Sequence, residues 1–124
     1  MSYLKFYQNE RYKFPVAKQV HTSDKGAEII IEKLRRHYKL RKYRKITIKF
    51  RNSRGGGTCY YCERKIILSH NPSLLLIAHE FAHLLNYEKG KSHYHTKQLM
   101  ISIKRILNYC FKKECWVQEI SRRC

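Results

Sequence analysis

The sequence predicts an α+β domain with an N-terminal helix, a small three-stranded sheet, a central helix and a C-terminal helix. The chain has 124 residues, which is enough for one domain and too short for two. Apolar residues recur at helical spacing in three segments, and a stretch between the first two alternates apolar and polar residues as strands do. Because 43% of the residues are hydrophobic, the chain can pack a core despite its heavy charge.

The first helix is expected to begin after an irregular or loosely docked basic arm at residues 1–21, where no periodicity is visible. Thr22 or Ser23 can cap this helix, and Asp24 favours its first turn. Its apolar positions follow helical spacing and are Ala27, Ile30, Ile31 and Leu34. We expect the helix to end near Tyr38.

Three short strands are expected next. Residues 46–51 alternate apolar and polar side chains with period two, which is typical of a half-buried strand. Three consecutive glycines at 55–57 then mark a loop. Residues 58–61 and 65–69 are rich in β-branched and aromatic side chains, so they should form a hairpin or one bent strand.

The central helix is expected over residues 73–88. Asn71 is a good N-cap, Pro72 suits the first helical position, and Gly90 marks the end of the helix. The segment is apolar on almost every side, which indicates a helix that its neighbours bury completely.

This central helix carries the sequence His79-Glu80-Phe81-Ala82-His83. Residues four apart on a helix share one face, so the two imidazoles can reach a single ion. Glu80 is offset from them by about 100°, where it can take a proton from a metal-bound water. Composition alone produces such a pattern with roughly 2% probability. Because these polar side chains would be costly in an apolar helix without a partner, we expect a catalytic zinc with Glu80 as the base.

A third helix is expected to start near His95 or Thr96. Its apolar positions recur at helical spacing and are Leu99, Met100, Ile103, Ile106, Leu107 and Cys110. This stripe should pack on the central helix. Because His95 lies on the same stripe, its side chain should point inward.

A catalytic zinc usually takes three protein ligands and leaves one position open. We favour His95 as the third ligand, with His93 as the alternative. Glu88 is the least favoured because it ends the motif's own helix. Tyr87, His93 or Tyr94 could stabilise an oxyanion, and the sequence does not choose among them.

These features resemble the SprT-like branch of the zincin metallopeptidases over residues 27–107. The resemblance rests on the order of elements, on the Asn-Pro helix start, on the five residues from His79 to His83, and on Gly90-Lys91-Ser92-His93-Tyr94-His95 before another helix. It implies a minimal zincin fold with His79, His83 and His95 as zinc ligands and Glu80 as the base. Zincins bind an extended peptide along an edge strand, which would be about residues 58–68 here.

The resemblance also implies a division of the chain into the basic arm at 1–21, a SprT-like metallopeptidase domain at 22–111 and a basic C-terminal tail at 112–124. The family includes proteases that degrade proteins crosslinked to DNA. The paired-cysteine zinc ribbon that is frequent at the C-terminus of the family is not visible in this sequence.

The five cysteines allow a second, structural zinc. Cys59 and Cys62 have zinc-ribbon spacing, and Cys110 with Cys115 could complete a four-thiolate site. The second pair is loosely spaced, so ordinary buried or half-buried thiols are the favoured interpretation. A thioredoxin-like redox role would need the cysteines at the N-terminus of a helix, whereas these precede strand residues.

The net charge of +18 indicates a polyanionic partner, although a general adaptation of a whole proteome would also produce it. The most basic segment is 35–51, whose tyrosines could stack on bases. The expected nucleic-acid-binding residues are Arg35, Arg36, Lys39, Arg41, Lys42, Tyr43, Arg44 and Lys45. The alternative is a solvated helix end and strand face.

Together these observations predict a SprT-like zinc endopeptidase that acts on DNA-bound or DNA-crosslinked proteins. One alternative is a nucleic-acid-binding module with a structural zinc, although such a site has no use for Glu80. Another is a metallopeptidase that cleaves one regulatory protein. The first eight residues show no apolar core of the length typical of a signal peptide, and no stretch approaches about 20 apolar residues. We therefore expect a cytoplasmic monomer without membrane association, whose partners are a protein or peptide substrate and single-stranded or nonspecifically bound DNA.

Overall fold

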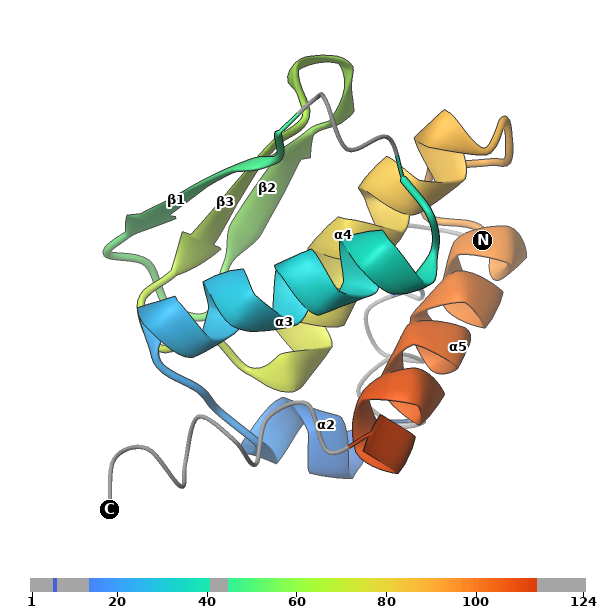
Figure 1. The fold of residues 1–124 in the computed structure, drawn as a ribbon. Coiled ribbons are helices and arrows are strands. Elements are labelled where there is room, and N and C mark those ends of the chain that lie inside the picture. The colour runs from blue at the N-terminus through green and yellow to red at the C-terminus, as the bar shows by residue number, and fades with distance from the viewer. Residues whose placement is uncertain (1–5, 7–13, 41–44, 114–124) are drawn as a thin grey trace.

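The computed structural model describes residues 6, 14–40 and 45–113 (Figure 1). Within these ranges the chain forms four helices and one mixed three-stranded sheet, which confirms the α+β class. The elements are α2 (Pro15–Gln19), α3 (Asp24–His37), β1 (Thr47–Arg51), β2 (Gly57–Tyr60), the 3-10 turn η1 (Tyr61–Glu63), β3 (Lys65–Ser69), α4 (Leu74–Glu88) and α5 (Lys97–Lys113). Helix α4 lies between the sheet and α5 and contacts both (Figure 1).

The sheet has the strand order β1-β3-β2. β2 and β3 pair antiparallel through η1, so the expected hairpin is confirmed, and β1 joins β3 in parallel. The turn closes at Arg64, whose φ of 50° lies in the left-handed region. Ile66 and Leu68 of the central strand are fully buried in the core. Because β3 is the central strand, β1 and β2 are the two edge strands of this sheet. Of these two, β2 is the one in extensive contact with α4.

Helix α3 begins as the sequence predicts. The Ser23 hydroxyl accepts a hydrogen bond from the Gly26 backbone N–H at 2.9 Å, which makes Ser23 the N-cap. The predicted apolar face is buried and consists of Ala27, Ile30, Ile31 and Leu34. The helix ends at His37, and Lys39 then turns the chain with a φ of 57°.

Helix α4 is capped by Ser73, whose hydroxyl accepts a hydrogen bond from the Leu76 N–H at 3.1 Å. The expectation that Asn71 is the N-cap is wrong. Asn71 has a φ of 50°, and its N–H donates to the Asp24 carboxylate at 2.9 Å, which holds it outside the helix. Because the neighbouring Pro72 carbonyl accepts from the Thr22 N–H at 3.1 Å, tertiary hydrogen bonds set this helix start.

Helix α5 packs its predicted stripe against α4. Leu99, Ile103 and Ile106 are completely buried, as expected. The helix begins at Lys97, one or two residues later than predicted, and it includes the first two residues of the expected tail, Lys112 and Lys113. No helix in the described ranges is both long and apolar enough to cross a bilayer.

The expectation of an irregular arm is wrong for residues 15–19, which form α2. Pro15 occupies the first helical position, where its fixed φ favours a helix start. Phe6 is also well placed, with its side chain fully buried. The remaining residues of the arm, 1–5 and 7–13, lie outside the described part of the chain, as do residues 114–124 of the tail.

Candidate metal centre

Three histidines converge on one point beside α4. His79 and His83 lie one turn apart on this helix with their Nε2 atoms 3.2 Å apart. With His95, their ligand atoms all lie within 4.8 Å of one another. A tetrahedral ion with metal–nitrogen bonds of 2.0–2.1 Å separates its ligand nitrogens by about 3.3 Å. The three histidines can therefore hold a metal ion.

His95 comes to the site from the residues immediately before α5. The Thr96 carbonyl accepts the first hydrogen bond of that helix, from the Met100 N–H at 3.1 Å, so His95 lies just outside the helix start. Among the described residues, His79, His83 and His95 form the one group of three or more possible ligands, and His93 is not part of it. The structure thus brings together the three histidines that the sequence favoured.

His93 supports the site through its main chain. Its carbonyl accepts a hydrogen bond from Nδ1 of His83 at 2.5 Å. A proton on Nδ1 leaves the lone pair of Nε2 directed at the other histidines, which is how supporting groups commonly orient metal-binding imidazoles. Burial, together with the neighbouring His79, lowers the pKa of His83 to about 4, so this ring is neutral near pH 7 and able to bind a metal.

Glu80 lines the same hollow as the three histidines. This hollow has a volume of about 310 Å³, and its other lining residues are Gly57, Thr58, Cys59, Tyr61, His93 and Tyr94. The Glu80 side chain is only 4% exposed. A largely buried carboxylate beside three convergent imidazoles is the arrangement expected of a base that serves a metal-bound water.

Gly57 allows β2 to approach this carboxylate closely. A Cβ atom added at Gly57 would lie 3.1 Å from Glu80 Cγ and 3.0 Å from the Ile67 carbonyl oxygen. Both distances are shorter than ordinary van der Waals contact, so a larger residue would displace either the strand or Glu80. The sequence marked this glycine only as part of a loop, whereas it begins the strand beside the site.

Phe6 forms part of the apolar surroundings of the histidines. Its ring packs edge-on against His79, with centroids 5.7 Å apart, and against His95 at 5.0 Å. His79 itself is only 3% exposed. Two of the three candidate ligands are thus packed by a residue of the N-terminal arm, which periodicity in the sequence could not reveal.

A buried hydrogen-bond network fixes the loop that carries His93 and His95. Asn86, which lies on α4 three residues after His83, is 1% exposed. Its side-chain amide donates to the Ser92 carbonyl at 2.7 Å, and its side-chain oxygen accepts from the Ser102 hydroxyl at 2.6 Å. The Asn86 amide thus ties together α4, the loop and α5. The sequence analysis did not single out this residue.

The tyrosines near the site are arranged differently from the expectation. Tyr94 lines the metal hollow and is 65% exposed, whereas Tyr87 lines a separate hollow with Cys62 and Arg64. The Cys62 thiol donates a weak hydrogen bond to the Tyr87 hydroxyl at 3.5 Å. Tyr61, which the sequence placed in a strand, also lines the metal hollow. Of the expected oxyanion-stabilising residues, His93 and Tyr94 line the metal hollow. Tyr87 does not line it, but its ring packs against those of Tyr61 and His93, with centroids 4.7 and 5.3 Å apart.

The structure gives no support for a four-thiolate zinc site among the residues it describes. Cys59, Cys62 and Cys110 form no common ligand group, while Cys115 lies outside the described part. Cys110 is buried in α5. Burial, with the nearby charge of Glu80, raises the pKa of Cys59 well above its usual range, so this sulfur remains a protonated thiol.

Glu88, the least favoured ligand, is used elsewhere. Its carboxylate accepts hydrogen bonds from the Arg64 guanidinium at 2.7 and 3.1 Å. The Arg64 side chain is 7% exposed and that of Glu88 is 18% exposed. This ion pair joins the turn before β3 to the end of α4, and it removes Glu88 from consideration as a metal ligand.

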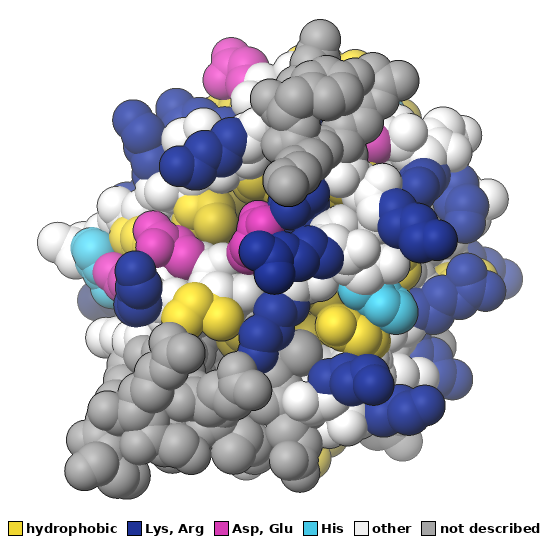
Figure 2. Space-filling view, in the orientation of Figure 1, with side chains coloured by type: hydrophobic (Ala, Val, Ile, Leu, Met, Phe, Trp, Pro, Cys, Tyr) yellow, Lys and Arg dark blue, Asp and Glu magenta, His cyan; other side chains and the backbone are white. Residues whose placement is uncertain are grey.

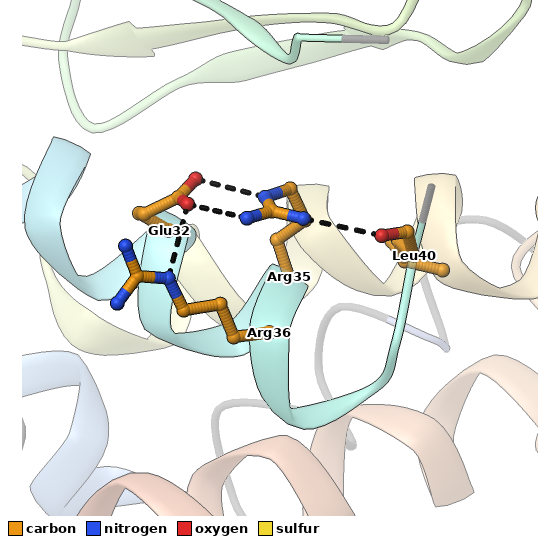
Figure 3. Close-up of polar contacts among 4 residues, drawn as sticks. All are labelled: Glu32, Arg35, Arg36 and Leu40. Atoms are coloured by element: carbon orange, nitrogen blue, oxygen red, sulfur yellow. Dashed lines mark hydrogen bonds and ion pairs between the residues drawn. The ribbon is translucent and has the colours of Figure 1, made fainter. Parts of the chain in front are cut away.

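Arg35 was expected to bind nucleic acid, but its guanidinium is already engaged by other residues of the chain. Its guanidinium donates to both carboxylate oxygens of Glu32, at 2.6 and 2.9 Å, and to the Leu40 carbonyl at 3.2 Å (Figure 3). The side chain is only 10% exposed, so these contacts occupy a phosphate-binding group inside the fold. Arg36, in contrast, is 74% exposed and makes one longer bond to Glu32, at 3.3 Å.

The other expected nucleic-acid contacts divide into two groups. Lys39 and Lys45 are exposed, as a surface contact requires. Four residues lie outside the described part of the chain: Arg41, Lys42, Tyr43 and Arg44.

No protein-family profile matches this sequence, and comparisons with curated proteins and with solved structures find no match either.

Proposed function

We propose that this chain is a zinc-dependent endopeptidase of the SprT-like type, associated with DNA and acting on DNA-bound or DNA-crosslinked proteins. One observation carries the enzymatic part of the proposal. The ligand atoms of three histidines and the carboxylate of Glu80 meet in one hollow, next to an edge strand of the sheet.

The chemistry follows from the residues present. A bound zinc lowers the pKa of a coordinated water and polarises the carbonyl group of a peptide bond. Glu80 is placed to accept the proton of the attacking water and to return it to the departing amine. His93 and Tyr94 lie at the same hollow as candidate hydrogen-bond donors to the oxyanion.

The sheet topology narrows the expected substrate-binding segment. Residues 58–68 include β3, which is the central strand and pairs on both sides. Among the described strands, β2 is the edge strand beside the metal hollow, and its residues Gly57, Thr58 and Cys59 line that hollow. An extended peptide would add to the edge of β2 through main-chain hydrogen bonds, which bind without strong sequence preference.

The open hollow favours an enzyme over a nucleic-acid-binding module with structural zinc. Structural zinc sites are closed by four protein ligands, whereas catalytic sites keep one position for water or substrate. Here the ligand group among the described residues has three members, and the hollow is lined by the largely exposed Tyr94. A buried carboxylate at a purely structural site would also be costly.

Association with DNA is supported by charge. The chain carries +18 net charges, and Arg36, Lys39 and Lys45 are exposed. Such a surface binds polyanions in a salt-sensitive and largely sequence-independent way. A narrow peptidase that cleaves one regulatory protein would instead show a restricted substrate range and no response to DNA.

The test is protein cleavage with and without single-stranded DNA, comparing the unaltered chain with Glu80→Gln. Metal analysis first establishes one zinc per chain in both proteins. We expect both to bind zinc and only the unaltered chain to cleave, with DNA increasing its rate. If both bind zinc and neither cleaves any protein, the enzyme assignment fails and the binding module replaces it.

A further inference from the structure

Another hollow, separate from the metal hollow and from the one lined by Tyr87, lies between the ends of α3 and α4 and the middle of α5. It has a volume of about 340 Å³ and is lined by Tyr38, Asn86, Lys89, Lys91, Ser102 and Arg105, together with Leu85. Three of these side chains are cationic and three are neutral hydrogen-bonding groups, and no carboxylate is among them. Lys and Arg side chains gather on this side of the molecule, over α5 and the C-terminal end of α4 (Figure 2).

The cations of this hollow lie at the surface and make no ion pair within the described ranges. Lys89, Lys91 and Arg105 are exposed, and none of them takes part in an ion pair with another residue of the described ranges. This distinguishes them from Arg35 and Arg64, whose guanidinium groups are held by Glu32 and Glu88. Three cations that converge on one hollow repel each other unless an anion joins them.

Helix ends explain only part of this arrangement. Lys89 is the C-cap of α4, where a cation interacts favourably with the negative end of the helix dipole. Arg105 lies in the middle of α5, which spans Lys97–Lys113, so the dipole gives it no such role. Its charge lies close enough to Tyr38 to offset in part the effect of burial, which raises the pKa of that hydroxyl. Arg105 thus faces the hollow beside a hydroxyl that can donate a hydrogen bond.

We propose that this hollow is a binding site for a phosphate group, held by Arg105 and Lys91 with Lys89 at its rim and the Tyr38 hydroxyl as a further donor. A guanidinium fork suits the paired oxygens of a phosphate, and the flexible ammonium groups supply additional charge. The natural source of the group is the nucleic-acid backbone, given the net charge of +18. Apart from Tyr38, the site lies outside the basic segment 35–51 of the sequence analysis, and it supplies a defined anchor that the sequence did not reveal.

Two residues that line this hollow also take part in the hydrogen-bond network beside the metal centre. Asn86 and Ser102, which line the hollow, are the hydrogen-bonded pair that also holds the Ser92 carbonyl. A phosphate bound here would lie next to the network that fixes the loop bearing His95. The proposal rests on the nucleic-acid association in the proposed function, although it does not require the chain to be a peptidase.

The experiment uses the full chain and measures binding to a fluorescent oligothymidylate by anisotropy at several salt concentrations. Arg105→Gln is compared with Lys104→Gln, because both residues are exposed neighbours on α5 and each change removes one charge. Lys104 does not line the hollow. We expect Arg105→Gln to weaken binding roughly tenfold and to reduce the slope of log K against log salt by about 0.7, with little change for Lys104→Gln. Urea unfolding of each variant confirms that the fold is intact.

A second arm measures inorganic phosphate by calorimetry. If phosphate binds and Arg105→Gln abolishes that binding while oligonucleotide affinity is unchanged, the site stands but its ligand is a free phosphate. If Arg105→Gln and Lys104→Gln weaken the oligonucleotide equally and phosphate does not bind, diffuse charge explains the affinity and the proposal is overturned. Because binding is measured without cleavage, failure of the peptidase assignment is distinguishable from failure of this site.

Discussion

His83 donates a hydrogen bond from Nδ1 to the carbonyl of His93, and this bond gives a residue of the loop a supporting role without making it a ligand. The contact uses the main chain, so the His93 ring is not needed for it. The ring of His95, in contrast, lies in the ligand group. The two histidines, only two residues apart, therefore contribute to the centre in different ways.

Replacing these two histidines in turn should separate the two roles. We expect His95→Ala to lower zinc affinity by more than the roughly 10–100-fold that removal of a supporting group costs. His93→Ala keeps the main-chain carbonyl, so its zinc affinity should stay within a few fold of that of the unaltered chain. Competition titration with a chelating dye measures both affinities, and equal losses in the two variants would contradict the assignment of His95.

Asn86→Leu should weaken both the fold and the metal centre. The change removes the hydrogen bonds to the Ser92 carbonyl and from the Ser102 hydroxyl, and unpaired buried groups of this kind cost about 1–3 kcal/mol. Because the loop loses its anchor, zinc affinity should fall by roughly 10–100-fold.

Urea unfolding and zinc titration test this prediction. The control is Ser102→Ala, which removes only one of the two bonds and leaves the loop anchor in place. A variant Asn86→Leu that is destabilised but binds zinc normally would show that the network serves the fold alone.

Gly57→Ala should impair cleavage more than metal binding. Its Cβ would lie 3.0 Å from the Ile67 carbonyl oxygen and 3.1 Å from Glu80 Cγ, so the strand or the Glu80 side chain must shift, whereas none of the histidines is among the three atoms nearest to that Cβ. Strain of this kind typically costs about 1–3 kcal/mol. The matched control is Gly56→Ala, because the nearest atom to its added Cβ, the Ser53 hydroxyl oxygen, is 3.8 Å away. We expect Gly57→Ala to cleave more slowly than Gly56→Ala, while the two variants bind zinc with equal affinity. Equal cleavage rates would show that Gly57 is not needed for β2 to pack closely against Glu80.

Acidification should weaken the contact between Glu32 and Arg35. Hydrogen bonds from Arg35 hold the pKa of Glu32 below its usual 4.5, so the pair stabilises the fold fully above that pH. The contribution is lost as the pH falls through the lowered pKa of the folded state. Because the Glu32 side chain is 47% exposed, the effect should be at most about 1 kcal/mol. Urea unfolding measures the free energy of unfolding between pH 6 and pH 3, and Glu32→Gln should lose less of it than the unaltered chain. If the variant and the unaltered chain have the same pH profile, the pair is energetically neutral.

Local patterns in the sequence were enough to predict the elements that hold the metal motif. His79, Glu80 and His83 are placed by helical periodicity alone, because their spacing is fixed within one helix. His95 could be predicted because it continues the buried stripe of α5. Both inferences depend on residues close to each other in the sequence.

Most of the features that escaped prediction depend on contacts between distant segments. Asn71 has the side chain of a good cap, but its hydrogen bond with Asp24 holds it in a left-handed conformation outside the helix. Phe6 packs on His79 and His95 across most of the chain. Arg35 is the exception, because its partner Glu32 is only three residues away. There the sequence did not show that the Arg35 side chain is buried.

The packing of Phe6 and His95 around His79 has a consequence for the order of folding. Contacts between residues far apart in the sequence form late, because closing long loops is entropically unfavourable. A chain emerging from the ribosome that has released α4 but not the residues before α5 has two of the three histidines. The complete centre can assemble only once His95 is free to meet the other two, so translation itself delays the moment at which the chain acquires its metal.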